Sequence, residues 1–135
     1  MALITWTEEL SVNIAEMDKE HKQLVAMINE LHEAMATGKG KDVLGGVMTR
    51  LVDYTKFHFA AEEKLMSSNQ YPGYPNQKTE HDNLTKKVSD IKARLDAGNM
   101  VVTVEVMTFL KDWLTKHIMG LDKKYSDFLN GKGVR

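Results

Sequence analysis

The segment LGGVMTRLVDYTKFHFAAEEKLM, residues 44–66, decides the fold, because one side of it repeats with the period of an α-helix. Successive positions on that side lie three or four residues apart, which places them on one helical face. They are Leu44, Val47, Leu51, Thr55, His58, Glu62 and Leu65. The stripe turns polar near its end, where a plain bundle would keep leucine. The sequence therefore predicts a helix over about 42–66 with polar groups in its buried face.

Three other segments, about 17–37, 75–96 and 103–129, carry similar stripes. They are separated by a glycine-lysine turn, by the segment NQYPGYP that holds both prolines, and by Ala97-Gly98-Asn99. Such short connections make consecutive helices antiparallel neighbours. We therefore expect an all-α fold, an antiparallel up-down-up-down four-helix bundle, with residues 1–135 forming a single domain and an N-terminal arm at 1–16.

Residue types at the expected helix ends agree with these boundaries. Asp42 and Thr103 are expected to cap the second and fourth helices, and Gly38 and Gly98 stand where the first and third should end. The pair Gly45-Gly46 lies inside the second helix at a cost of about 1 kcal/mol per glycine. It indicates either close packing against another helix or local fraying.

Composition limits the chemistry and the location of the chain. Cysteine is absent, so a metal would be held by nitrogen and oxygen atoms. The formal charge of -1 gives no indication of a nucleic-acid partner. The N-terminus lacks a secretory signal, and no apolar run approaches the roughly 18 residues needed to span a bilayer. We expect a cytoplasmic protein without membrane insertion.

Polar side chains lie in register with all four apolar stripes. They are His21, His58, Glu62, Gln77, His81 and His117, with Asp122 following in the last helix. In an up-down-up-down bundle these positions share one end. Burying such groups without partners costs about 1–3 kcal/mol each, so they are expected to meet at a metal centre.

Spacing within the helices supports this layer. His58 and Glu62 are four residues apart, as are Gln77 and His81, so each pair faces one direction. His117 and Asp122 are five apart and converge only if their helix bends or loosens. Imidazole and carboxylate ligands suit iron, zinc, copper or nickel. Four histidines with two acids are too many for one tetrahedral zinc, and two metals bridged by both carboxylates fit the set better.

Other polar residues have simpler interpretations. His32 lies about three turns from His21 and is expected at the boundary of the core. Glu63 is expected to face solvent. Asp18 is expected either to cap the first helix or to support His21 by a hydrogen bond.

An ordered set of motifs extends over nearly the whole chain. It comprises Trp6, Met17-Asp18-x-x-His21-Lys22-x-Leu24, His58-Phe59-x-x-Glu62-Glu63, Tyr71-Pro72 leading to His81, and His117-x-x-x-x-Asp122. Each motif alone is weak, but their order is specific. The sequence resembles the hemerythrin family, in particular the single-domain bacterial hemerythrins.

The resemblance implies a non-haem centre of two Fe ions. His21 and His58 would hold the iron with an open position for dioxygen, and His81 and His117 would hold the second iron. Glu62 and Asp122 would bridge the pair together with an oxo or hydroxo group.

Gln77 departs from the family pattern, which has a third histidine of the second iron at this position. A glutamine oxygen is a neutral and weaker ligand than imidazole. Gln77 is expected either to coordinate, to leave a water in its place or to leave a second open position, and each option predicts weaker iron retention or faster autoxidation. By the same resemblance an apolar oxygen pocket is lined by Phe59, Trp113, Leu114 and Ile118.

The function implied by the resemblance is reversible dioxygen binding, as an oxygen carrier, store or supplier rather than an enzyme. The alternatives are a di-iron oxidase or peroxidase and an oxygen or redox sensor module. A His-x-x-x-Glu spacing with more histidine than carboxylate favours the carrier over enzymes built on Glu-x-x-His pairs. The expected partners are dioxygen and an oxygen-consuming enzyme, with the chain acting as a monomer.

Overall fold

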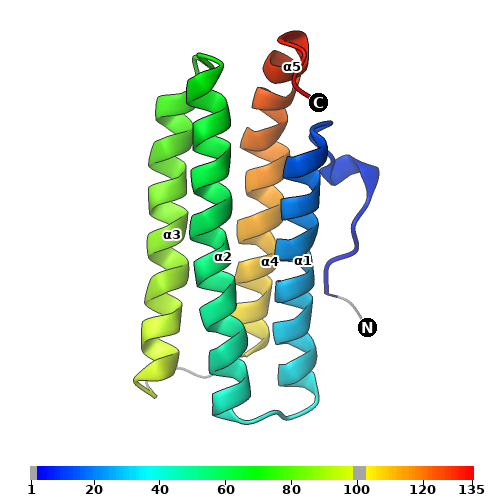
Figure 1. Ribbon diagram of the computed structural model, residues 1–135. Coiled ribbons are helices and arrows are strands. Elements are labelled where there is room, and N and C mark those ends of the chain that lie inside the picture. The colour runs from blue at the N-terminus through cyan, green and yellow to red at the C-terminus, as the bar shows by residue number, and fades with distance from the viewer. Residues whose placement is uncertain (1–2, 99–102) are drawn as a thin grey trace.

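The computed structural model describes residues 3–98 and 103–135, apart from the side chain of Lys41. Helix α1 spans Ala15–Ala36, α2 spans Lys41–Ser68 and α3 spans Tyr74–Asp96. The fourth rod is composite: α4 spans Val104–His117, a π-helical segment η2 spans Ile118–Asp122, and α5 spans Lys123–Gly131. The rods run antiparallel to their chain neighbours (Figure 1). The predicted all-α four-helix bundle is confirmed.

The apolar stripes form the core between the rods. Leu24 and Ile28 of α1, Leu51 of α2, Val88 of α3 and Leu110 of α4 have no exposed surface. Each buried aliphatic side chain contributes about 1.5–3 kcal/mol relative to an exposed one. The core fills the part of the bundle below the polar layer and holds the four rods in register.

The helix ends follow the expected chemistry in three of four places. Thr103 accepts a hydrogen bond from the backbone N–H of Val106 at 3.3 Å and caps α4 as predicted. Gly38 and Gly98 adopt positive φ angles of 71° and 78° just after α1 and α3, as predicted. Asp42 is not the cap of α2, because the helix already begins at Lys41. Its carboxylate lies in the first turn, where negative charge complements the helix dipole.

The pair Gly45-Gly46 matches neither interpretation made from the sequence. Helix α2 runs through both residues without a break. A Cβ atom at Gly45 would lie 3.9 Å from Asp96 Oδ1, and one at Gly46 would meet nothing within 4 Å among the described atoms. Nothing in the described part of the chain explains the two glycines.

The N-terminal arm packs along α1 before the helix begins at Ala15. Ile4 exchanges two hydrogen bonds of 2.9 Å with the Asn29 side chain. Asp18 accepts from the Val12 N–H at 2.8 Å and from the Ser11 hydroxyl at 2.6 Å. Both predictions for Asp18 are therefore wrong: it neither caps the helix nor contacts His21, but fastens the arm to it.

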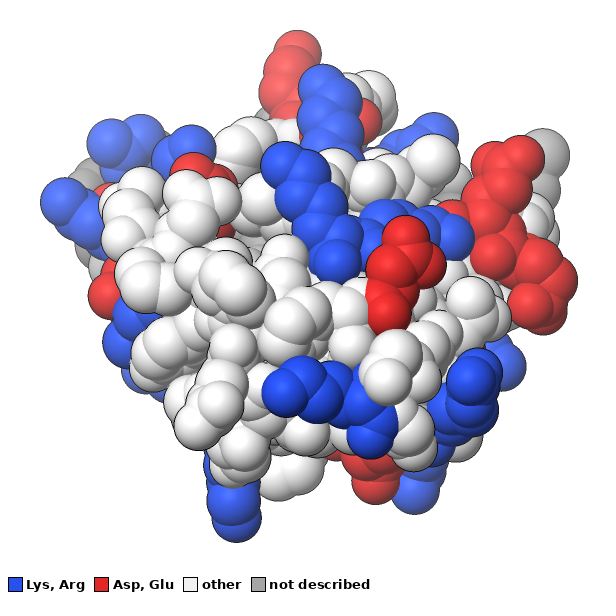
Figure 2. All heavy atoms as spheres, turned by 90° about the horizontal axis from the view of Figure 1, so that it is seen from above, with Lys and Arg blue, Asp and Glu red and all other residues white. Residues whose placement is uncertain are grey.

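Figure 2 looks onto the end of the bundle that carries the α2–α3 connection and α5. Side chains of both charge signs are interspersed with uncharged surface on this face (Figure 2). None of the helices formed by residues 3–98 and 103–135 is long and apolar enough to cross a membrane.

Candidate metal centre

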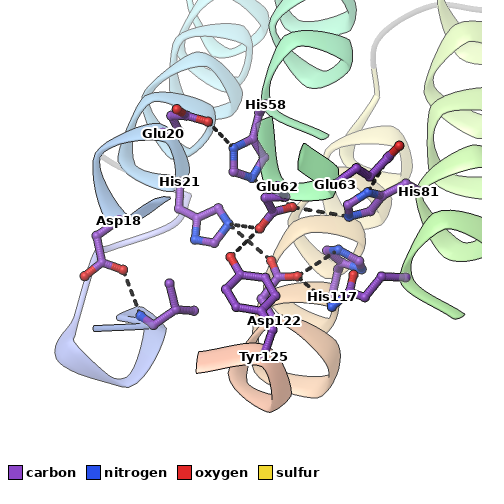
Figure 3. Close-up of polar contacts among 12 residues, drawn as sticks. Asp18, Glu20, His21, His58, Glu62, Glu63, His81, His117, Asp122 and Tyr125 are labelled. Atoms are coloured by element: carbon purple, nitrogen blue, oxygen red, sulfur yellow. Dashed lines mark hydrogen bonds and ion pairs between the residues drawn. The ribbon is translucent and has the colours of Figure 1, made fainter. Parts of the chain in front are cut away.

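The polar layer predicted from the sequence lies inside this end of the bundle. His21 comes from α1, His58 and Glu62 from α2, His81 from α3, and His117 and Asp122 from the fourth rod; their side chains converge (Figure 3). All of them and Gln77 are buried. His32 lies outside this layer at a half-buried position, as expected.

Glu62 lies at the centre of the layer. Its Oε1 atom is 3.2 Å from the Nε2 atoms of both His58 and His81, without the alignment of a hydrogen bond. Its Oε2 atom is 3.2 Å from His21 Nε2. One carboxylate thus contacts imidazoles from three helices, which is the arrangement a bridging ligand requires.

Asp122 provides the second carboxylate. Its Oδ2 atom is 3.1 Å from His21 Nε2 and its Oδ1 atom is 3.1 Å from His117 Nε2. The π-helical turn Ile118–Asp122 accommodates one residue more than an α-turn, so position i+5 faces the direction that i+4 would otherwise take. The loosening of the helix that the five-residue spacing required is therefore present.

Two further carboxylates support the histidines from outside the layer. Glu20 Oε1 lies 2.7 Å from His58 Nδ1, and Glu63 Oε2 lies 2.8 Å from His81 Nδ1. Such contacts place a proton on Nδ1 and direct Nε2 toward the centre. The expectation that Glu63 faces solvent is wrong, since its side chain is only 17 % exposed.

Glu20 and Tyr125 are members of the site that the sequence interpretation missed. The Tyr125 hydroxyl donates to Glu62 Oε2 at 2.5 Å from a fully buried position. Both residues did carry a weak signal. Glu20 lies four residues before Leu24 of the α1 stripe, and Tyr125 lies three residues after Asp122.

Electrostatics favour protonated His21 and His58 next to an ionised Glu62. Burial lowers the pKa of His21, but hydrogen bonds to Asp122 and Glu62 outweigh it and raise the pKa to about 8. Burial likewise opposes the charge on His58, whereas Glu62 and Glu20 raise its pKa to about 10. Burial acts to raise the pKa of Glu62, but the neighbouring histidines hold it well below its usual value. The protons thus occupy positions that a cation could take.

The donor atoms fit a pair of metal ions. Within the described residues, the Nε2 atoms of His58, His81 and His117, Glu62 Oε1 and Asp122 Oδ2 are buried without a hydrogen-bond partner. Unpaired buried polar atoms cost about 1–3 kcal/mol each, so this concentration indicates a cation-binding site. Two groups have ligand atoms within 4.8 Å of one another: His21, His58 and Glu62, and Glu62, His81, His117 and Asp122. They share Glu62, and each contains one of the two histidine pairs that the resemblance implies.

A small pocket adjoins the histidines. It is narrow and holds about 190 Å³ of empty space, part of it open to solvent. Three of the residues assigned to the oxygen pocket, Phe59, Trp113 and Leu114, line it together with Leu24 and Leu84. Ile118 is fully buried but is not among its lining residues.

The sequence model of the Hemerythrin HHE cation binding domain matches residues 12–129. The chain belongs to the hemerythrin family. It is 36% identical over 131 residues to the bacteriohemerythrin of Methylococcus capsulatus, covering 96% of this chain and 99% of that relative. It is 28% identical over 120 residues to the myohemerythrin of Sipunculus nudus, covering 89% and 88% of the two chains.

Solved structures agree with this assignment. The crystal structure of a wild-type hemerythrin superposes with a TM-score of 0.88 at 35% identity, covering 93% of this chain and 97% of that chain. The resemblance identified from the ordered motifs is confirmed, and so is the helical bundle it implied.

Proposed function

We propose that this hemerythrin-family chain binds dioxygen reversibly at two iron ions and acts as an oxygen carrier, store or supplier rather than as an enzyme. The proposed ligands are His21, His58, Glu62, His81, His117 and Asp122. The observation that carries the proposal is the buried layer of four imidazoles and two carboxylates. Their ligand atoms form two groups that share Glu62, and several of these atoms have no hydrogen-bond partner.

When bound, the iron pair supplies the electrons and the open position that dioxygen requires. The chain contributes the spacing of the two positions, because Glu62 and Asp122 each contact histidines of both groups. It also contributes fixed histidine orientations, through Glu20 on His58 and Glu63 on His81.

The adjoining pocket favours release of an intact gas molecule over its reduction. Its wall is mainly apolar and the pocket is narrow. The Trp113 indole N–H is not a free donor in the pocket, because it donates to the Leu84 carbonyl at 3.2 Å. An apolar wall that limits the access of water disfavours cleavage of the O–O bond, which an oxidase would need.

The test is anaerobic loading with iron(II), followed by metal analysis, optical titration with dioxygen and degassing. We expect two irons per chain, uptake of one dioxygen per pair, and loss of the visible band on degassing. His58→Ala should lose this response, whereas His32→Ala, a histidine outside the layer, should keep it. Steady dioxygen consumption with a reductant would instead establish an oxidase and refute the carrier.

The same proposal includes the setting in which the chain works. We propose a monomer in the cytoplasm that delivers dioxygen to an oxygen-consuming enzyme. Sedimentation of the loaded protein tests the first part, because a larger species at micromolar concentration would contradict it.

A further inference from the structure

Gln77 is the one member of the polar layer that is neither an acid nor a histidine. It lies one turn before His81 on α3, and its side chain is buried. Its amide nitrogen donates to Asp122 Oδ1 at 3.4 Å. The amide therefore reaches the carboxylate that also contacts His117, and lies beside the group formed by Glu62, His81, His117 and Asp122.

The amide oxygen of Gln77 is buried and has no hydrogen-bond partner among the described residues. A buried amide oxygen without a partner is destabilising, and an apolar side chain of similar size would avoid that cost. The amide nitrogen is already engaged with Asp122, and its lone pair is delocalised into the carbonyl group, so it cannot bind a metal. The oxygen is thus the only atom of this side chain with free acceptor capacity.

From these contacts we infer that Gln77 is a metal-binding residue, which supplies Oε1 as a neutral oxygen ligand at the His81–His117 position and orients Asp122 through its amide nitrogen. This inference rests on the proposed two-metal site. With Gln77 as a ligand, the two metal positions differ in their donor atoms, although each has two imidazoles. No amide side chain among the described residues contacts the His21–His58 position, whereas the His81–His117 position gains a carbonyl oxygen beside two carboxylates.

The donor set predicts a difference in metal preference. Carbonyl and carboxylate oxygens suit manganese(II), while imidazole suits iron and zinc. The His81–His117 position should therefore accept Mn²⁺ more readily than it would with a third nitrogen ligand. Gln77→His should shift that position toward iron, because it exchanges a neutral oxygen donor for a neutral nitrogen donor.

The experiment is metal binding to the full chain under anaerobic conditions, by chelator competition with Fe²⁺ and separately with Mn²⁺. In Gln77→Leu we expect the second metal to bind roughly 10–100-fold more weakly, with the first unchanged. Gln77→His should retain two Fe²⁺ and lose relative affinity for Mn²⁺. Gln23→Leu, at an exposed position of α1, is the matched control and should change neither metal.

A crystal structure of the wild-type iron(II) form gives a readout that does not depend on any variant folding. The amide oxygen at bonding distance from the metal beside His81 supports the inference. An amide turned away from the metal refutes it, as does unchanged second-metal affinity in a folded Gln77→Leu. In both of these cases the proposed function stands if the wild type holds two irons. If the wild type holds fewer, the proposed function itself fails.

Discussion

Raising the pH should destabilise the metal-free chain, because His21 and His58 hold protons more tightly in the folded state than in the unfolded one. Burial opposes these charges, but contacts with Glu62, Asp122 and Glu20 raise the pKa values to about 8 and about 10. A raised pKa contributes stability that is complete below the unfolded value near 6.5 and is lost as the pH rises through the folded value.

The magnitude follows from the size of the shift. For His21 the difference between 6.5 and about 8 corresponds to about 2 kcal/mol, at about 1.36 kcal/mol per pH unit. This part should disappear between about pH 6.5 and pH 8. His58 adds a loss of the same sign that continues toward its own pKa near 10. Together they amount to a large fraction of the stability of an ordinary domain.

The assay is urea unfolding of the metal-free chain in chelator at several pH values between 6 and 9, which avoids ionisation of tyrosine and lysine. His21→Ala should lose part of the pH slope, whereas His32→Ala should keep it. Metal-loaded protein should show the opposite trend, because metal ions displace these protons and bind more tightly as the pH rises. Metal-free stability that stays constant or increases from pH 6.5 to 9 would refute the reasoning.

Three further substitutions test individual contacts. Tyr125→Phe removes the buried hydroxyl donor to Glu62 and should lower the free energy of unfolding of the metal-free chain by about 1.5–3 kcal/mol, measured by urea unfolding. Glu20→Gln weakens the support of His58 Nδ1 and should reduce iron affinity by about 10–100-fold in chelator competition. Trp113→Ala should cost about 3–5 kcal/mol of stability and speed autoxidation of the oxygenated protein, because Trp113 separates the inner pocket from a groove between α3 and α4.

Matched controls separate these effects from general damage. Tyr54→Phe removes a hydroxyl from a half-buried tyrosine of α2 and should change stability little. Glu16→Gln alters an exposed acid of α1 and should leave iron affinity unchanged. Phe109→Ala enlarges the outer groove only, since Phe109 does not line the inner pocket. Equal effects from a control and its partner would contradict the contact in question.

The sequence predicted the fold and the inner layer of the site because both depend on helical periodicity. Stripes with a period near 3.6 determine which side of each helix is buried, and short connections determine which end of the bundle each residue occupies. His58 and Glu62 illustrate this. Residues four apart in a helix point to the same side, however the helices pack against one another. The family motifs then identified the same residues independently.

The outer contacts could not be predicted, because they depend on the distance between helices rather than on the face within one helix. Glu20 and Glu63 each stand next to a polar-layer residue in the sequence, and each turns toward a histidine of a neighbouring helix. Asp18 was misread for the same reason, since the path of the arm decides its partners. A charged residue at the edge of a stripe looks like solvent-facing surface until its neighbouring helix is placed.

The π-helical turn points the Asp122 carboxylate toward the histidines of the site. Deleting Gly120 tests whether the turn is needed for this placement. Gly120 is exposed, and a Cβ atom there would meet nothing within 4 Å among the described atoms, so Gly120→Ala should fold and bind two metals. Deletion reduces the spacing between His117 and Asp122 to four and permits a regular α-helix. The chain after it must then shift by about 1.5 Å, the rise of one residue.

That shift is far larger than the roughly 0.2 Å tolerance of a metal–ligand distance. Either Asp122 leaves its position between His21 and His117, or α5 moves and Tyr125 loses its contact with Glu62. The deletion variant should therefore remain helical by circular dichroism but bind its second metal more weakly than Gly120→Ala. Equal metal affinity in both variants would mean that the π-helical turn accommodates an extra residue without positioning the carboxylate. The position of Asp122 would then depend on packing alone.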